Sequence, residues 1–230
     1  MFAIVIDVKV ILSLENQSKE PRLTLIPTLS NDAQTCSGKL RRVTKPRKLF
    51  KGGQIGLVLT DRPRKAIPPA CKEFFHEVEL GVVIATKAKD VSEDRALDYV
   101  AGYALCLDMT AWDFQCAAKA DGQPWSLAKG FDTACPVSKF IPKENIPDTN
   151  NAQLWLKVNG STKQDSSTSD MIFTVPQVIC YLSKYFTLEQ GDIILTGSPA
   201  GAGPVTSGEV IEAGLEAEGK SLITMKFLVQ

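Results

Sequence analysis

The sequence has almost no histidine, no paired cysteine motif and no long apolar run. His76 is the only histidine among 230 residues. No Cys-x-x-Cys pair occurs, and the spacing is typical of reduced thiols in an intracellular protein; the six cysteines are Cys36, Cys71, Cys106, Cys116, Cys135 and Cys180. No apolar stretch approaches the ~18 residues that span a bilayer, so we expect no membrane partner.

Charge is balanced overall but unevenly distributed. Lysine plus arginine and aspartate plus glutamate each number 26, so net charge indicates no polyanionic partner. Residues 1–65 carry 13 basic and 5 acidic side chains, whereas residues 66–230 carry 13 basic and 21 acidic ones. We therefore expect a basic, partly disordered N-terminal segment over 1–65 and a domain of different composition over 66–230.

Two stretches of this N-terminal segment permit an interpretation. The apolar start, residues 1–14, contains Asp7 and Lys9 and no basic leader, so it resembles a buried strand more than a signal or transit peptide. Residues 39–51 hold seven basic residues in thirteen. A nucleic-acid or nuclear-import patch is one interpretation. A solvated basic segment is the more usual fate of such a run, so we do not expect a nucleic-acid partner.

Three short helices are predicted beyond residue 66. Ser92 is a good N-cap before acidic residues, and Gly102 is expected to stop that helix. Thr110 is expected to cap a second helix that ends at Gly122. Thr174 is expected to begin a third, with Gly191 closing it.

Strands outnumber these helices. Residues 81–85, 103–108 and 192–197 are predicted as strands, and residues 221–229 alternate with Ile223, Met225, Phe227 and Val229 on one face. Asn159-Gly160 between two such runs is typical of a type I′ hairpin. The pattern indicates a β-rich α+β fold.

The stretch FHEVEL, residues 75–80, places two carboxylates at alternate positions next to an apolar strand. Residues two apart in a strand share a face, so Glu77 and Glu79 would lie close together. Like charges at that distance repel unless a cation lies between them. Either this is a solvent-facing edge strand or a positive group binds there.

Asp108 is a third candidate carboxylate, because it ends an apolar strand at the rim of the expected core. Three carboxylates suit Mg²⁺, Mn²⁺ or Ca²⁺ better than a thiophilic metal. By spacing alone, two exposed strand glutamates and one capping aspartate remain the alternative. His76 lies on the opposite strand face and is expected to be a packed or hydrogen-bonded side chain rather than a ligand.

Two further segments are candidates for the site. Lys129 follows apolar residues in PWSLAKGF and is expected either to reach water or to pair with charge. Glycines at 197, 201 and 203 in TGSPAGAGP allow close backbone approach to a ligand, or form an ordinary turn.

Several long motifs, in order from about residue 67 to the C-terminus, resemble the fumarylacetoacetate hydrolase family, in particular its small acylpyruvase and oxaloacetate decarboxylase members. The motifs are FHEVELGVVI, DYVAGYALCLDMTAWDFQ, PWSLAKGFDTACPVS, LWLKVNG, MIFTVPQVI and TLEQGDIILTGSPAGAGPV.

This resemblance implies that residues 66–230 form a catalytic domain with a mixed β-sandwich roll and that residues 1–65 are divergent. Such proteins are usually homodimers and often mitochondrial, although a cytoplasmic location stays open. By resemblance, Glu77, Glu79 and Asp108 match ligands of Mg²⁺ or Mn²⁺. Lys129 matches the active-site lysine, and the substrate-pocket positions match Gln115 and Thr196.

The sequence also departs from the family pattern. Trp112 stands where the family motif D-M-T-A-R-D has an arginine that would contact a substrate acid. Residues 1–65 match neither the G-R-N-Y-x-x-H nor the L-F-L-K-P segment of such members, so the lid histidine of the first is absent. A divergent relative, an alternative first exon and an incorrect gene model would each produce this difference.

The resemblance implies metal-dependent cleavage of a C–C bond in small 3-oxo acids, by acylpyruvate hydrolysis or oxaloacetate decarboxylation. Loss of the lid histidine and of the arginine predicts impaired activity, more for hydrolysis than for decarboxylation. The alternative is a non-catalytic, metal-binding relative that acts as a binding or dimerising protein.

Overall fold

The computed structural model describes residues 10–11, 64–65 and 67–230. Within them lie three sheets, with strand orders β1-β10-β4-β5-β7, β11-β3-β6 and β2-β13-β12-β8-β9. The strand bounds are β1 Val10–Ile11, β2 Arg64–Lys65, β3 Phe74–His76, β4 Val78–Ile84, β5 Val100–Leu107, β6 Thr110–Ala111, β7 Ile141–Pro142, β8 Ala152–Val158, β9 Ser161–Ser167, β10 Ile193–Leu195, β11 Gly203–Pro204, β12 Val210–Ala217 and β13 Lys220–Val229.

The helices of this part are short. The α-helices are α1 Trp112–Ala120, α2 Ser126–Lys129 and α3 Val175–Tyr185, and the 3₁₀ helices are η1 Glu93–Tyr99, η2 Lys143–Asn145 and η3 Thr168–Asp170. Together with the three sheets they form the β-rich α+β fold that the sequence predicts. None of the described helices has the length and apolarity to cross a membrane.

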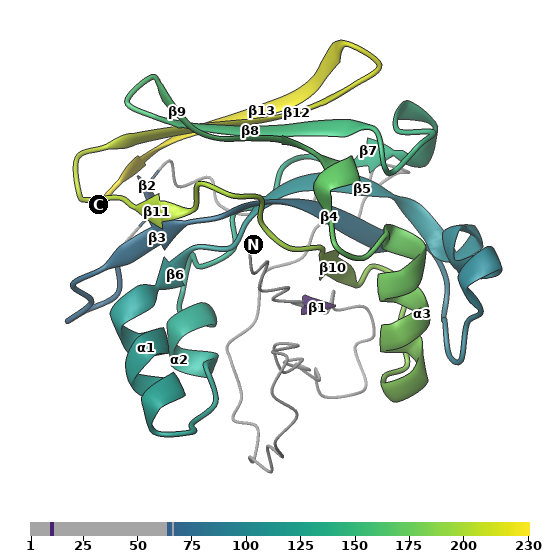
Figure 1. Ribbon diagram of the computed structural model, residues 1–230, viewed down its shortest axis with the longest axis horizontal. Helices are drawn as coiled ribbons and strands as arrows, with labels where there is room; N and C mark the ends of the chain where they lie inside the picture. The colour runs from purple at the N-terminus through teal and green to yellow at the C-terminus, as the bar shows by residue number, and fades with distance from the viewer. Residues whose placement is uncertain (1–9, 12–63, 66) are drawn as a thin grey trace, which may run out of the picture.

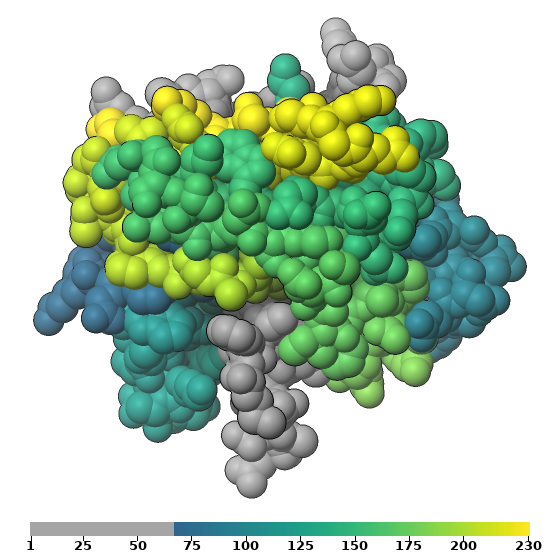
Figure 2. Space-filling model, turned by 45° about the horizontal axis from the view of Figure 1, so that its top comes forward, coloured from purple at the N-terminus to yellow at the C-terminus, as the bar shows by residue number. Residues whose placement is uncertain are grey.

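Two sheets pack face to face, and the α-helices lie on the far side of one of them. In Figure 1 the sheet that contains β8, β9, β12 and β13 lies above β4 and β5, with α1, α2 and α3 below. Figure 2 shows the first of these sheets covering the upper part of the molecule. The main core fills the space between the sheets, with Leu80, Leu105, Leu156 and Leu215 fully buried in it.

The pleat of β4 and β5 sorts their side chains onto two faces. Leu80 and Leu105 face the main core, whereas Val83 and Cys106 belong to a second, smaller cluster on the opposite face. Glu79 pairs with Cys106 in the antiparallel register of the two strands. The glutamate therefore lies on the face away from the sandwich core.

The hairpin and the third helix agree with the sequence predictions. β8 and β9 are joined by Asn159 and Gly160, both at positive φ (50° and 79°), as a type I′ turn requires. Thr174 caps α3 in a capping box with Gln177. In β13 the alternate residues Phe227 and Val229 are buried.

The prediction that Gly102 stops a helix after Ser92 is wrong. The segment forms the 3₁₀ helix η1, and β5 already begins at Val100, earlier than the expected strand at 103. Gly102 lies inside β5, where an added Cβ would come 2.2 Å from the carbonyl oxygen of Ile141. The glycine therefore permits close approach of β7 rather than helix termination.

Two other helix boundaries also differ from prediction. Thr110 does not cap α1, because it pairs with Phe75 in β6 and Ala111 occupies the N-cap position. Gly122 has a positive φ of 63° just past the end of α1, as expected. Gly191 does not close α3, which ends at Tyr185, so this glycine serves the later turn into β10.

Of the N-terminal segment 1–65, the structure describes residues 10–11 and 64–65, and the latter form β2 beside β13. Val10–Ile11 forms β1 and pairs antiparallel with β10, in agreement with a strand near the start. The rest of that strand and the basic stretch 39–51 lie outside the described residues.

Candidate metal centre and active site

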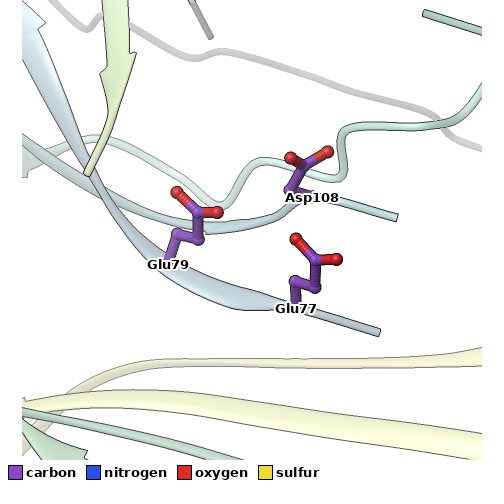
Figure 3. Close-up of side chains that lie close together, drawn as sticks. All are labelled: Glu77, Glu79 and Asp108. Carbon is purple, nitrogen blue, oxygen red and sulfur yellow. The ribbon is translucent and has the colours of Figure 1, made fainter. Parts of the chain in front are cut away.

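Three carboxylates converge where β3 gives way to β4 and where β5 ends. Glu77 lies between β3 and β4, and Glu79 lies in β4 on the same face. The backbone N–H of Asp108 donates to the carbonyl of Glu77 (2.8 Å), which places the aspartate directly across the strand pair. Figure 3 shows the three side chains close together on one side of these strands.

The cluster is compact and mostly shielded from water. One carboxylate oxygen from each of Glu77, Glu79 and Asp108 lies within 4.8 Å of the others. Glu79 and Asp108 are fully buried, and the side chain of Glu77 is 14% exposed. The alternative of exposed strand glutamates with a capping aspartate is therefore wrong for these residues.

Lys129, the last residue of α2, supplies positive charge to the cluster. Its ammonium lies 3.0 Å from Oε2 of Glu77 and 2.9 Å from Oδ2 of Asp108. It also donates to the hydroxyl of Thr110 at 2.7 Å, and that hydroxyl donates to Oε1 of Glu77 at 3.0 Å. The lysine is buried and pairs with charge, as one of its two sequence interpretations predicts.

Glu79 is the carboxylate with the least compensation. Its Oε2 accepts a hydrogen bond from the backbone N–H of Gly197 at 2.7 Å. Its Oε1 is buried and has no hydrogen-bond partner in the described part of the chain. Burial raises the pKa of Glu79 well above its ordinary value, and the charges of Asp108 and Glu77 raise it further.

These features fit a hard divalent cation. The donor set is three carboxylates. One buried oxygen, Oε1 of Glu79, has no hydrogen-bond partner among the described residues and could bind a cation. Such oxygen ligands suit Mg²⁺ or Mn²⁺ rather than a thiophilic metal. Glu77, Glu79 and Asp108 are the residues that would hold it.

His76 lies on the other face of the strand, as predicted. It is buried, and its Nδ1 lies 3.1 Å from Oε1 of Gln164 in β9. Burial lowers its pKa. The histidine therefore ties β3 to the upper sheet and takes no part in the carboxylate cluster.

The two predicted substrate-pocket residues, Gln115 and Thr196, are both buried. Gln115 in α1 has a buried Oε1 without a hydrogen-bond partner among the described residues. The hydroxyl of Thr196 donates to the carbonyl of Leu80 at 2.9 Å. Thr196 thus joins the loop before Gly197 to β4, and its contact with substrate stays a prediction.

The glycines of the loop at 196–204 have separate tasks. Gly197, at φ 102°, presents its N–H to Glu79. Gly201, at φ 96°, has no room for a Cβ, which would come 2.0 Å from the carbonyl oxygen of Lys163. Gly201 therefore serves close backbone packing against β9, which is the turn interpretation.

Sequence reasoning missed one contributor to the site. Thr110 carries the signature of a helix cap, yet its hydroxyl lies between Lys129 and Glu77. Gly197 belongs to a candidate loop of the sequence, but the sequence does not predict its hydrogen bond to Glu79. The position of Thr110 two residues after Asp108 in an extended segment is the signal that could have found it.

Comparison with known proteins identifies the family of this chain. The family described as "Fumarylacetoacetate (FAA) hydrolase C-terminal" matches residues 28–226. The chain belongs to the fumarylacetoacetate hydrolase family. This match begins well before residue 67, where the motifs recognisable in the sequence begin, and so includes part of the segment expected to be divergent.

Named relatives in this family are enzymes of oxaloacetate. The chain is 53% identical over 164 residues to "Oxaloacetate tautomerase FAHD1, mitochondrial" of Bos taurus, covering 71% of this chain and 72% of that protein. It is 52% identical over 149 residues to "Oxaloacetate decarboxylase, mitochondrial" of Dictyostelium discoideum, covering 65% and 68%.

A solved structure of the family shares the fold. Fumarylpyruvate hydrolase from Pseudomonas aeruginosa, in complex with Mn²⁺ and pyruvate, superimposes with a TM-score of 0.68 at 31% identity. The match covers 72% of this chain and 70% of that one. The expected family fold is therefore confirmed.

Proposed function

We propose that this chain is a divalent-metal-dependent enzyme acting on small 3-oxo acids, by oxaloacetate decarboxylation, acylpyruvate hydrolysis or both. The observation that carries the proposal is the set of Glu77, Glu79 and Asp108, with the Lys129 ammonium between Glu77 and Asp108. The names of the relatives support oxaloacetate, and the Mn²⁺ and pyruvate of the solved fumarylpyruvate hydrolase support metal and substrate class.

Mg²⁺ or Mn²⁺ bound to the three carboxylates would act as a Lewis acid toward the negative charge that develops on a 2-oxo acid. The chain's own contribution is a second positive charge. The Lys129 ammonium, which pairs with Glu77 and Asp108, would hold a substrate carboxylate. The hydroxyl of Thr110 accepts a hydrogen bond from this ammonium at 2.7 Å.

Hydrolysis asks more of the site than decarboxylation does. It requires an activated water, whereas loss of CO₂ from oxaloacetate requires no nucleophile. The only histidine, His76, is buried on the other face of β3 and hydrogen-bonded to Gln164, so it cannot serve as that base. We therefore propose that hydrolysis is impaired more than decarboxylation.

The family resemblance and the relatives' names also support a location and an assembly. We propose a mitochondrial protein, because the oxaloacetate enzymes it resembles are named as mitochondrial. A homodimer is proposed from the family resemblance alone.

A non-catalytic, metal-binding role is the second candidate. Trp112 at the arginine position favours it, because this side chain cannot form an ion pair with a substrate acid. Intact carboxylates and Lys129 favour the enzyme. The two candidates differ in turnover and agree in metal binding.

The deciding experiment is an assay of the purified full chain with oxaloacetate and with acetylpyruvate, with and without Mg²⁺ or Mn²⁺. An enzyme releases pyruvate only when metal is present, and the rate falls on chelation. Tight metal binding by calorimetry without turnover of either compound would favour the binding protein. Lack of metal binding would rule out both.

A further inference from the structure

A partly exposed aromatic pair, Phe75 and Trp112, lies next to the carboxylate cluster in the sequence. The rings of Phe75 and Trp112 are stacked, with centroids 4.9 Å apart and an interplanar angle of 12°. Trp112 begins α1, and its backbone N–H donates to the carbonyl of Glu73. The residue is 37% exposed. A stacked ring that stays partly exposed offers a surface for another flat or apolar group.

Strand geometry places this pair on the same face as the proposed metal ligands. Phe75 precedes Glu77 by two residues, so the two side chains share a face about 7 Å apart along the strand. Phe75 also lies opposite Thr110 in the β3–β6 register, and the Thr110 hydroxyl bonds to Glu77. The aromatic pair thus lies on the same face of the strands as the carboxylates.

The exposed start of α1 next to this pair carries no cation. Trp112 and Gln115 are three residues apart and share one side of the helix. Gln115 is uncharged, and its buried Oε1 is without a partner in the described part of the chain. The basic residue of α1 is Lys119, exposed in its last turn. Apolar or aromatic atoms fit such a wall better than a second carboxylate does.

We propose that Phe75 and Trp112 bind the acyl end of the substrate and select 2-oxo acids with an uncharged aromatic or apolar group over those with a second carboxylate. This specificity rests on the proposed function and, within it, favours binding of an acylpyruvate over oxaloacetate. It concerns substrate affinity, whereas the missing histidine concerns the rate of hydrolysis. Trp112 is thus a specificity residue, because it contacts the variable acyl group and not the 2-oxo acid end that all these substrates share.

The test is binding, measured by calorimetry on the full chain loaded with Mg²⁺. Three probes share one chelating oxamate group: oxamate itself, N-phenyloxamate and N-oxalylglycine, which adds a second carboxylate. We expect N-phenyloxamate to bind about tenfold more tightly than oxamate, in line with the usual strength of ring stacking and burial. N-Oxalylglycine should gain nothing over oxamate.

Variants then assign the preference to the tryptophan. Trp112→Ala should remove the advantage of N-phenyloxamate and leave Mg²⁺ affinity unchanged, because no carboxylate is altered. Trp112→Arg should instead improve N-oxalylglycine by roughly ten- to hundredfold, through a charge-assisted pair. Tyr185→Ala removes an exposed aromatic ring of α3 and should change none of the three affinities.

Two failures are distinguishable. If Mg²⁺-loaded protein binds none of the probes, the proposed function fails and the inference falls with it. If oxamate binds but N-phenyloxamate gains nothing, or N-oxalylglycine binds best, only the aromatic wall is overturned. The comparison in the unaltered chain decides this even if a Trp112 variant does not fold.

Discussion

Asp108 and Glu77 are joined through their backbones as well as by their place in the cluster. The N–H of Asp108 donates to the carbonyl of Glu77 at 2.8 Å, and both carboxylates accept from the ammonium of Lys129. Glu79, which faces the same space, receives its hydrogen bond from the Gly197 N–H instead. The three carboxylates therefore differ in what stabilises them without metal.

Metal binding should require all three carboxylates. Glu79→Gln and Asp108→Asn each remove one of three protein ligands, so each should abolish measurable Mg²⁺ binding, as should Glu77→Ala. Calorimetry on the metal-free variants provides the measurement, with Glu212→Gln, a half-buried strand glutamate of β12 paired with Lys226, as the control. Unchanged Mg²⁺ affinity in Glu79→Gln and Asp108→Asn would show that the site is misplaced.

The same two variants should change the metal-free stability in opposite directions. Glu79→Gln removes a buried carboxylate whose neighbours are acidic, so the free energy of unfolding should hold or rise by about 1 kcal/mol. Asp108→Asn removes an ion-pair partner of Lys129 and should lower it by about 1–3 kcal/mol. Urea unfolding in chelator measures both, and equal shifts of one sign would contradict this account.

Lys129 should compete with the metal. Lys129→Met keeps the length of the side chain and removes the ammonium that now lies among the carboxylates. We expect tighter Mg²⁺ binding, by about tenfold, together with weaker oxamate binding and loss of turnover. Weaker Mg²⁺ binding in this variant would mean that the lysine organises the ligands rather than replacing the ion.

Asp192 should make stability depend on pH at a distance from the site. Burial raises its pKa to about 6, so between about pH 4 and 6 the folded chain holds a proton that the unfolded chain has lost. Stability from this group is therefore present below pH 4 and falls as pH rises through 6. Asp192→Asn keeps an acceptor for the Glu189 N–H and should raise stability at pH 8 by about 1–3 kcal/mol.

The measurement is the unfolding free energy of both proteins from pH 4 to pH 8. The difference between Asp192→Asn and the unaltered chain should be small at pH 4 and grow towards pH 8. A difference that stays constant over this range would show that the carboxyl does not titrate there.

The ratio of the two proposed activities should be skewed towards decarboxylation. A general base typically contributes about 10²–10⁴-fold, so acylpyruvate hydrolysis should fall by that factor against a relative that carries the family's histidine segment. Decarboxylation should fall less. Replacing residues 1–65 by such a segment should rescue hydrolysis preferentially, with both rates measured at saturating Mg²⁺. Full hydrolase activity in the unaltered chain would sink this argument.

The sequence by itself determined the local features of the site. The two-residue spacing of Glu77 and Glu79 in an extended, apolar stretch requires a shared face, and the structure has it. The Asn159-Gly160 turn and the Thr174 cap are likewise local, because each depends on the backbone preference and hydrogen bonds of a few neighbouring residues. The opposite orientation of His76 follows from the same pleat.

Only the tertiary structure decided what these residues meet. The register of β4 against β5 places Asp108 across from Glu77, and α2 brings Lys129 between them. Thr110 and Gly102 bear the local marks of a helix cap and a helix stop, yet strand pairing and the approach of Ile141 assign them other tasks. Long-range packing overrides a weak local preference because burial and strand hydrogen bonds contribute more free energy than a single cap does.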